Sequence, residues 1–412
     1  MVRLDANSHT QVSRIAYVVS LFPSYDETFI LREVRALADR GVHITIFSLR
    51  RRSQAVVQSE ARAFVADTHY APFLISKDVL GALVRALVQR GRTVLGLVAL
   101  IVRGCWRRPL ALLKSLAFVP KAIRFAEILR EQGIDRIHAH WATYPATTAL
   151  VMSRLTGVPW GLTCHAHDIF NDPSLLPEKI EAADFVLTCT ADNKRYLEGL
   201  TPVAARKVKV VYHGLDLKRF RPQRRPPGSD GFRILAVGSL LTCKGFDVLV
   251  AALGLLHRRG LAFEATVAGG GPEERNLRLQ ARAEGIADRV HFTGYATQEI
   301  LVPLYQNADV FVLPAVVGQH WGIANVLVEA LACAVPVVTT LLPSLPELVE
   351  DGVEGLVARN QDPVDLAEKI ERLAGDGELR QRMGAAGRRR VEERFDIDAN
   401  IGEVANALGV RA

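Results

Sequence analysis

A segment with the sequence G-S-L-L-T-C-K-G at residues 238–245 is the first candidate for chemistry in this chain. It follows an apolar run that predicts a strand and precedes one that predicts a helix. Backbone N–H groups at such a turn attract phosphate, and the ammonium group of Lys244 suits a diphosphate. We therefore expect Lys244 to contact a phosphorylated ligand. The alternative is a surface lysine beside an ordinary helix cap.

Two glycine-containing loops follow later strands. The loop G-G-G-P at residues 269–272 contains Gly271, and such runs either let the backbone approach a ligand or form plain tight turns. The segment W-G-I-A-N-V-L-V-E at residues 321–329 opens a helix and presents free N–H groups around Gly322, Ile323 and Asn325. Both loops are candidates for binding the same ligand.

Glu329 lies one helical turn beyond Asn325 on the same face. A carboxylate there can accept hydrogen bonds from a ribose diol. The alternative is a solvated glutamate, but its apolar neighbours indicate a mostly buried helix, where a carboxylate needs a partner.

Histidines recur where strands of the first half end. His165 and Asp168 belong to H-A-H-D at residues 165–168, directly after the apolar run W-G-L-T-C. A histidine there can hydrogen-bond a phosphate or a reacting hydroxyl near neutral pH. We expect no metal, because no third and fourth ligands are identifiable. His138 and His140 form a second pair, which we interpret as structural hydrogen-bonding residues.

Strand and helix patterns alternate in two successive sets. Apolar runs predict strands at residues 15–20, 43–49, 135–138, 160–164, 185–189 and 208–211, and, after a Pro- and Arg-rich break, at 233–240, 263–269, 290–294, 309–314 and 336–340. Helices are expected at roughly 28–40, 246–260, 325–333, 378–395 and 398–408. We expect an α/β protein with two doubly wound domains facing each other across a ligand cleft. Its predicted parts are residues 1–213, a linker at 214–231, residues 232–385, and helices at 386–412 that pack back toward the first domain.

Composition indicates a globular protein. The chain has 412 residues, of which 49% are hydrophobic, and its five cysteines have no metal-ligand spacing. We expect a cytoplasmic protein with reduced thiols and without a secretory signal, because the first 20 residues carry Asp5, Asn7 and His9 and lack a long apolar core. The longest apolar run, residues 94–102, is too short to span a bilayer. Ten basic residues and one acid, Glu127, lie between residues 85 and 130 among apolar residues. This pattern predicts an anionic membrane surface as a partner, the alternative being ordinary solvated helices. We expect no nucleic-acid partner.

The ordered set of segments resembles the family-4 retaining glycosyltransferases of bacterial polysaccharide synthesis. The resemblance covers most of the chain and is weakest at residues 52–130. Its segments are SRIAYVVSLFPSYDETFILREVRAL, IHAHWA, TCHAHDIF and VVYHGLDLKRF, then AVGSLLTCKGFDVLVAALGLL, VAGGGP, NADVFVLPA, GIANVLVEALACAVPVV and PELVEDGVEGLV. ETFILRE and HAHDIF are most similar to colanic-acid and exopolysaccharide glycosyltransferases. The resemblance implies the GT-B fold of two Rossmann-like domains and a hexosyltransferase-type activity.

The resemblance also implies roles for individual residues. It places His165 beside the donor sugar and phosphate as the catalytic residue, Lys244 against the diphosphate, Gly294 and Tyr295 at the base, and Glu329 at the ribose. We expect Gly271, Gly322, Ile323 and Asn325 in the same donor site, and Thr28, Phe29 and His140 on the acceptor side.

Two positions depart from the family pattern. Trp321 stands where the first glutamate of a paired-glutamate motif normally contacts the sugar, and Ser239 stands where many relatives have an arginine facing the diphosphate. Both positions remain in the expected donor site, but each lacks a charged contact. The departures put either the donor identity or the level of activity in question.

The expected reaction is retaining transfer from a UDP- or GDP-sugar to a glycan or lipid-linked acceptor, without cofactor or protein-bound metal, at the inner face of the cytoplasmic membrane. The alternatives are a catalytically weak or inactive GT-B protein that binds nucleotide or glycan within a synthesis complex, and a nucleotide-sugar epimerase.

Overall fold

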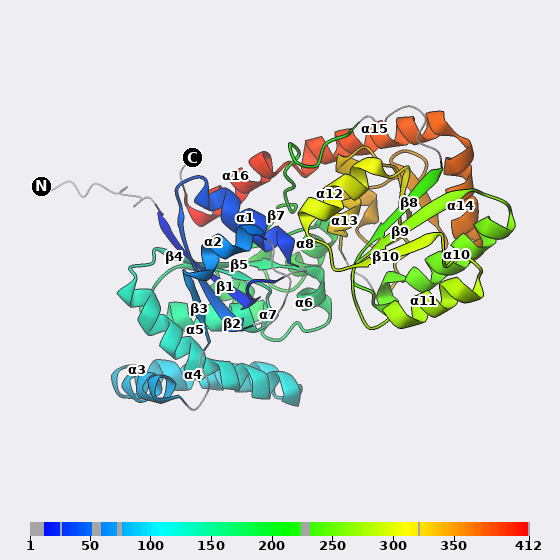
Figure 1. The fold of residues 1–412 in the computed structure, drawn as a ribbon. Coiled ribbons are helices and arrows are strands. Elements are labelled where there is room, and N and C mark those ends of the chain that lie inside the picture. The colour runs from blue at the N-terminus through cyan, green and yellow to red at the C-terminus, as the bar shows by residue number, and fades with distance from the viewer. Residues whose placement is uncertain are drawn as a thin grey trace, which may run out of the picture. The chain divides into compact units, whose positions relative to one another are not determined.

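The structure, a computed structural model, describes residues 12–24, 27–51, 59–71, 76–223, 231–319 and 322–410. The chain divides into two compact units (Figure 1). Unit 1 comprises Met1–Cys189, Asn193–Val211 and Asp398–Ala412, and unit 2 comprises Thr190–Asp192 and Tyr212–Ile397.

A parallel seven-stranded sheet forms the centre of unit 1, in the order β3-β2-β1-β4-β5-β6-β7. The strands are β1 (Arg14–Leu21), β2 (His43–Arg50), β3 (Thr68–Tyr70), β4 (Arg136–His140), β5 (Trp160–Cys164), β6 (Phe185–Thr188) and β7 (Val208–Val210). Strand order runs outward in both directions from the β1–β4 pair. In sheets of this type, ligands bind outside the carboxyl ends of the strands at that point.

Each face of this sheet is covered by helices. Along β1, Ala16 and Val18 point into one apolar cluster, and Tyr17 and Val19 point into another. The first cluster is closed by α3 (Lys77–Cys105), α4 (Pro109–Glu131), α5 (Tyr144–Thr156) and α7 (Leu176–Ala182), and the second by α1 (Thr28–Ala38) and α16 (Ile397–Leu408). The shorter elements are η1 (Ser59–Ala61), α2 (Arg62–Val65), α6 (Ala166–Phe170), α8 (Ala191–Glu198) and α9 (Ala204–Lys207). The alternation along the strand therefore produces a three-layer unit.

Within unit 1, helices α3 and α4 form a long hairpin (Figure 1). Helix α3 has 29 residues and a kink at Arg90, where φ is −137° and ψ is 32°. Within the described ranges, no helix combines the length and apolar character needed to cross a bilayer.

Unit 2 contains a parallel six-stranded sheet in the order β10-β9-β8-β11-β12-β13. The strands are β8 (Phe232–Val237), β9 (Phe263–Ala268), β10 (Val290–Gly294), β11 (Val310–Leu313), β12 (Val337–Thr340) and β13 (Gly355–Ala358). The helices are η2 (Thr242–Lys244), α10 (Phe246–Arg258), α11 (Glu274–Ala283), α12 (Gln298–Asn307), α13 (Asn325–Ala332), η3 (Leu345–Glu347), α14 (Pro363–Gly375) and α15 (Gly377–Arg394). Here strand order reverses at the β8–β11 pair.

The connecting segments have packing roles that their composition did not indicate. Residues 214–231 were expected as a linker, but Leu215 and Phe220 are buried in the core of unit 2, and residues 224–230 lie outside the described ranges. At the C-terminal end, Val391 of α15 is buried in unit 2, whereas Val404 and Leu408 of α16 are buried in unit 1.

Candidate functional site

A chain of buried polar side chains lies at the β1–β4 pair of unit 1. The hydroxyl of Tyr17 donates to Oε1 of Glu33 over 2.7 Å, and Nε2 of His140 lies 3.0 Å from the same oxygen. On the other side of the His140 ring, Nδ1 lies 3.3 Å from Nε2 of His165. Helix α1 and the ends of β4 and β5 are thereby joined.

Burial and neighbouring side chains set the protonation of the residues in this hydrogen-bonded cluster. Burial alone would raise the pKa of Glu33, but the electrostatic interaction and hydrogen bond with His140, with smaller contributions from His138 and Tyr17, lower it to about 2. Burial lowers the pKa of His138 to about 3, and burial beside Glu33 raises the pKa of Tyr17. Glu33 is therefore ionised and accepts hydrogen bonds, while His138 is neutral.

We predict that this cluster makes the protein sensitive to acid. Because the pKa of Glu33 is about 2 in the folded state against an ordinary 4.5, its stabilisation is present above pH 4.5 and is lost as pH falls toward 2. His138 also makes the folded protein less stable as the pH falls, since its pKa is about 3 in the folded state against an ordinary 6.5. When the pH falls from 7 to 3.5, the free energy of unfolding of Glu33→Gln should therefore decrease by about 1.5 kcal/mol less than that of the wild type, as measured by urea titration.

Glu181→Gln is the control for this experiment, because Glu181 is an exposed residue of the same unit. Its pH slope should match that of wild type. Identical slopes for wild type and Glu33→Gln would refute the assignment of acid sensitivity to Glu33.

A buried Asp168 and a buried Lys179 hold the backbone around this site. Oδ1 of Asp168 accepts the N–H of His165 over 2.7 Å, and Oδ2 accepts the N–H of Ala142. Nζ of Lys179 donates to the carbonyl oxygens of Ala142 and Thr143 over 2.6 and 3.0 Å. Burial raises the pKa of Asp168 to about 7 and lowers that of Lys179 to about 8. These contacts tie the end of β4 to the end of β5.

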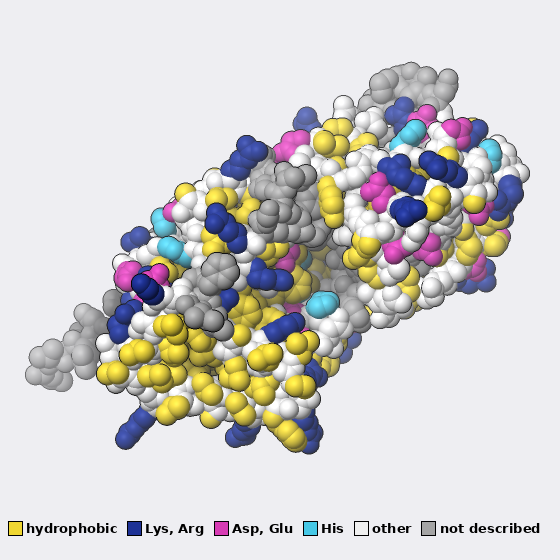
Figure 2. Space-filling view, turned by 60° about the horizontal axis from the view of Figure 1, so that its bottom comes forward, with side chains coloured by type: hydrophobic (Ala, Val, Ile, Leu, Met, Phe, Trp, Pro, Cys, Tyr) yellow, Lys and Arg dark blue, Asp and Glu magenta, His cyan; other side chains and the backbone are white. Residues whose placement is uncertain are grey.

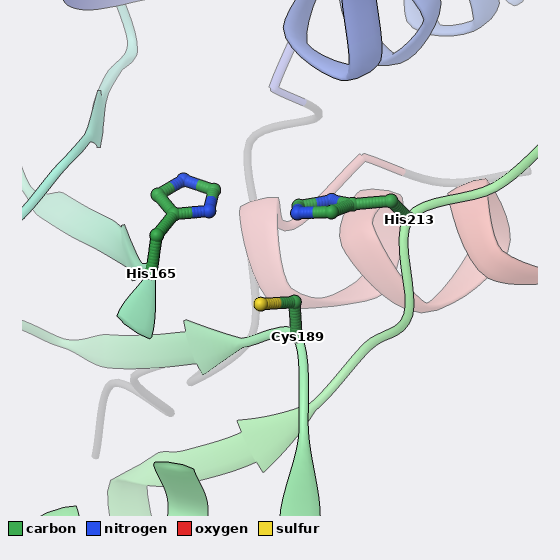
Figure 3. Close-up of side chains that lie close together, drawn as sticks. All are labelled: His165, Cys189 and His213. Atoms are coloured by element: carbon green, nitrogen blue, oxygen red, sulfur yellow. The ribbon is translucent and has the colours of Figure 1, made fainter. Parts of the chain in front are cut away.

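Trp141 completes the surroundings of His165. Its φ is 78°, a left-handed conformation that is rare for a bulky residue and common at functional sites. The rings of Trp141 and Phe29 lie 4.3 and 5.0 Å from the ring of His165, centroid to centroid. Figure 3 shows Cys189 after β6, with its sulfur directed toward His165, and a ring nitrogen of His165 lies within 4.8 Å of that sulfur. The ring of His165 is thus confined on several sides.

Loops at the β8–β11 pair of unit 2 surround Lys244. The half-buried Lys244 side chain passes beside Gly238, where an added Cβ would lie 4.0 Å from Lys244 Cδ. The N–H of Val316, after β11, donates to the carbonyl of Cys243 over 3.0 Å. The lysine loop is therefore fixed at the point where strand order reverses.

The glycine loop after β9 packs against that same segment. Gly269 has a φ of +145°, and a Cβ there would lie 1.9 Å from the carbonyl oxygen of Gly238. A Cβ at Gly271 would lie 2.5 Å from the carbonyl oxygen of Leu240. These glycines are required by the close approach of two backbone segments, which is a structural reason for the run independent of any ligand.

The remaining donor-site candidates lie on neighbouring loops and helices. The ring of Tyr295 is 46% exposed and covers Gly270. Glu329 is buried in α13, and its Oε2 accepts from the hydroxyl of Tyr305 over 2.9 Å. This contact supplies the partner that a buried carboxylate needs.

The expected site residues, except Trp321, lie in both units. Phe29, His140 and His165 are brought together in unit 1, and Thr28 begins the helix that carries Phe29. In unit 2, Ser239, Lys244, Gly271 and Tyr295 lie in three loops at strand ends, and Gly322, Ile323 and Asn325 lie at the start of α13. Trp321 lies outside the described residues.

Four residues of the unit 1 site were not expected from the sequence: Tyr17, Glu33, Trp141 and Lys179. Glu33 ends the segment ETFILRE and Trp141 belongs to IHAHWA, so both lay within segments that carried the family resemblance. Nothing in the local pattern of Tyr17 or Lys179 distinguishes them from core and surface residues.

Both halves of the chain match glycosyltransferase families. Residues 27–219 match the family described as Glycosyltransferase Family 4, and residues 218–390 match Glycosyl transferases group 1. WcaL of Escherichia coli K12, whose name assigns it to colanic acid biosynthesis as a glycosyltransferase, is 33% identical over 47% of this chain, and the match spans about half of WcaL (48%). D-inositol 3-phosphate glycosyltransferase of Frankia alni is 31% identical over 66% of this chain and 74% of that protein.

The fold is shared with solved structures. Anabaena HepE, crystallised with UDP and glucose, superposes with a TM-score of 0.70 at 17% identity, over 97% of this chain and all of that one. The two Rossmann-like units thus have the GT-B architecture. The chain belongs to the family-4, group 1 glycosyltransferases, with relatives in exopolysaccharide biosynthesis.

Proposed function

We propose that this glycosyltransferase moves a sugar, with retention of configuration, from a UDP- or GDP-sugar to a glycan or lipid-linked acceptor of a bacterial exopolysaccharide. The observation that carries the donor assignment is the Lys244 loop, held beside the glycine loop at the β8–β11 pair. Positive charge and backbone N–H groups at that position of an α/β sheet suit a diphosphate.

The residues divide the work between binding and chemistry. Lys244 and the N–H groups near Gly322 stabilise the negative charge that develops on the leaving diphosphate. Glu329, oriented by Tyr305, binds the ribose, and the backbone at Gly294 and Tyr295 meets the base. His165 orients the donor, and the leaving diphosphate helps to take the acceptor proton. The reaction needs no protein-bound metal on this route, so a chelator should leave activity unchanged.

A donor screen tests this proposal against its rivals. UDP and GDP release is measured for a panel of nucleotide sugars, with and without an extract of lipid-linked and glycan acceptors. Release that requires the acceptor supports transfer. An isomerised donor identifies an epimerase, and absence of both identifies a binding protein, the reading that Ser239 and Trp321 motivate because each replaces a charged family residue.

We further propose that unit 1 binds the cytoplasmic face of an anionic membrane through the α3–α4 hairpin. Nine of the twenty exposed large hydrophobic residues in the described ranges lie on this hairpin. In α3, Leu80, Val84, Val88, Leu95 and Val102 recur every four or seven residues and share one face, and Val88 is 81% exposed. Figure 2 shows hydrophobic side chains gathered at the hairpin end, with Lys and Arg around them.

This exposed face is additional to the face that packs on the sheet. Val94, Leu97 and Ile101 of α3 are buried in the core of unit 1. An ordinary amphipathic helix buries only one such apolar face. A second apolar face is typical of a site that contacts a membrane or another partner.

The charges favour an anionic lipid surface. Glu127, the single acid of the basic segment, contacts Arg85 at 2.8 Å and Arg124 at 3.1 Å. Seven other bases of the segment have no acidic partner among the described residues: Arg90, Arg92, Arg103, Arg107, Lys114, Lys121 and Arg130. Positive charge beside exposed apolar side chains matches phospholipid headgroups above acyl chains.

We predict that Arg103→Glu with Arg107→Glu weakens binding to anionic liposomes at least tenfold. Each base near such a surface contributes about 1 kcal/mol, and salt screens the attraction over roughly 8 Å at physiological strength. Arg108 is left unchanged because it lies 3.8 Å from Asp172. Binding is measured by cosedimentation across salt concentrations.

Leu95→Ser should also weaken binding, whereas Leu279→Ser is the matched control, because Leu279 is a half-exposed leucine of α11 in unit 2. Absence of wild-type binding to anionic liposomes at low salt would exclude this membrane role and favour a soluble acceptor.

A further inference from the structure

The contacts between Glu33, His140 and His165 have a defined direction. The carboxylate of Glu33 is an acceptor, and it already receives the hydroxyl of Tyr17. Nε2 of His140, 3.0 Å from Glu33 Oε1, must therefore carry a hydrogen and donate it. In a neutral imidazole this leaves Nδ1 of His140 without a hydrogen.

The next contact follows from this tautomer. With His140 neutral, its Nδ1 can only accept, so Nε2 of His165, 3.3 Å away, is the donor. His165 is thereby held as the Nε2–H tautomer. Its ring centroid lies 5.5 Å from that of His140, with 23° between the planes, and Trp141 contacts another side. Hydrogen bonding and packing together leave one orientation for this side chain.

We propose that Glu33 and His140 are positioning residues that fix the tautomer and ring orientation of His165 for the transfer reaction. This rests on the proposed function, in which His165 orients the donor. A carboxylate that sets the tautomer of a histidine has large effects on enzymes that depend on that histidine. Here the effect passes through a second imidazole, from α1 to the end of β5.

His138 provides a matched comparison within the same strand. It is fully buried, like His140, and its ring lies 5.0 Å from that of His140. Its Nε2 contacts the hydroxyl of Thr163 at 2.9 Å and lies 3.7 Å from Glu33. Among the contacts of the described residues, none joins His138 to His165, so its loss disturbs the core without breaking the proposed chain.

The experiment compares His140→Asn, His138→Asn and Glu33→Gln in the full chain. We expect His140→Asn and Glu33→Gln to lower kcat about tenfold or more with KM for the donor changed less than threefold. His138→Asn should keep kcat within threefold of wild type. Circular dichroism and thermal unfolding check that each variant is folded.

A second readout does not depend on turnover. In the 15N-histidine-labelled protein, with the His165 signals assigned by His165→Gln, we expect wild type and His138→Asn to show hydrogen on Nε2 of His165. In His140→Asn and Glu33→Gln both tautomers should be populated, because the amide groups can donate as well as accept. Hydrogen on Nδ1 of His165 in the wild type would overturn the proposal.

The two readouts separate the possible failures. Wild type that transfers no sugar from any donor refutes the proposed function, while the tautomer measurement still decides whether the hydrogen-bonded chain exists. Wild type that transfers sugar, with His140→Asn at full kcat or with His138→Asn equally impaired, refutes the positioning role and leaves the proposed function intact.

Discussion

Replacing Lys244 with methionine, or Glu329 with glutamine, should lower donor turnover roughly tenfold to a hundredfold while the protein stays folded. Each change removes one polar or charged contact with the nucleotide sugar, worth about 1.5–3 kcal/mol. Lys244 is half-buried in a loop, and glutamine keeps the size of Glu329 and an acceptor for Tyr305. Initial rates of UDP or GDP release with the preferred donor provide the measurement.

Lys369→Met is the control for Lys244, because Lys369 lies on α14 and contacts Asp365 at 3.9 Å. It should retain wild-type kinetics. If both Lys244→Met and Glu329→Gln turned over donor at the wild-type rate, the donor site in unit 2 would have to be placed elsewhere.

Gly269→Ala should destabilise the protein by about 3 kcal/mol or more. A methyl group at this position would lie 1.9 Å from the carbonyl oxygen of Gly238, and the φ of +145° is one that alanine rarely adopts. Strain of this kind and overpacking each cost about 1–3 kcal/mol. Urea titration, following the transition of unit 2, measures the effect.

Gly260→Ala separates the two causes. Gly260 also has a positive φ, +83°, but a Cβ there would have nothing within 4 Å. It should lose only the smaller, conformational part of the stability. Equal losses at positions 260 and 269 would show that the contact with Gly238 contributes nothing.

Most strands could be predicted from the sequence, because buried parallel strands are short apolar runs bounded by polar turns. Residues 160–164 and 290–294, for example, are strands in the structure with the expected bounds. Strand β13 was not expected. Its four residues, Gly355–Ala358, are too few to show a pattern, and pairing with β12 decides their conformation.

The α3–α4 hairpin shows a second limit of prediction from sequence. The basic and apolar composition of residues 85–130 was evident in the sequence, but helical periodicity cannot tell which of two apolar faces is buried. The structure buries Val94 and Leu97 and exposes Leu95 and Val102, since only the packed face meets the sheet of unit 1.

By itself, the sequence determined the two α/β halves, the loop position of Lys244 after a strand and the histidines at strand ends, because each depends on neighbours within a few residues. Only the tertiary structure decided that Glu33 contacts His140, 107 residues away along the chain, and that His140 contacts His165. Such contacts depend on which strands are adjacent in the sheet. The β1–β4 pairing and the packing of α1 bring these side chains together, and no local pattern specifies that arrangement.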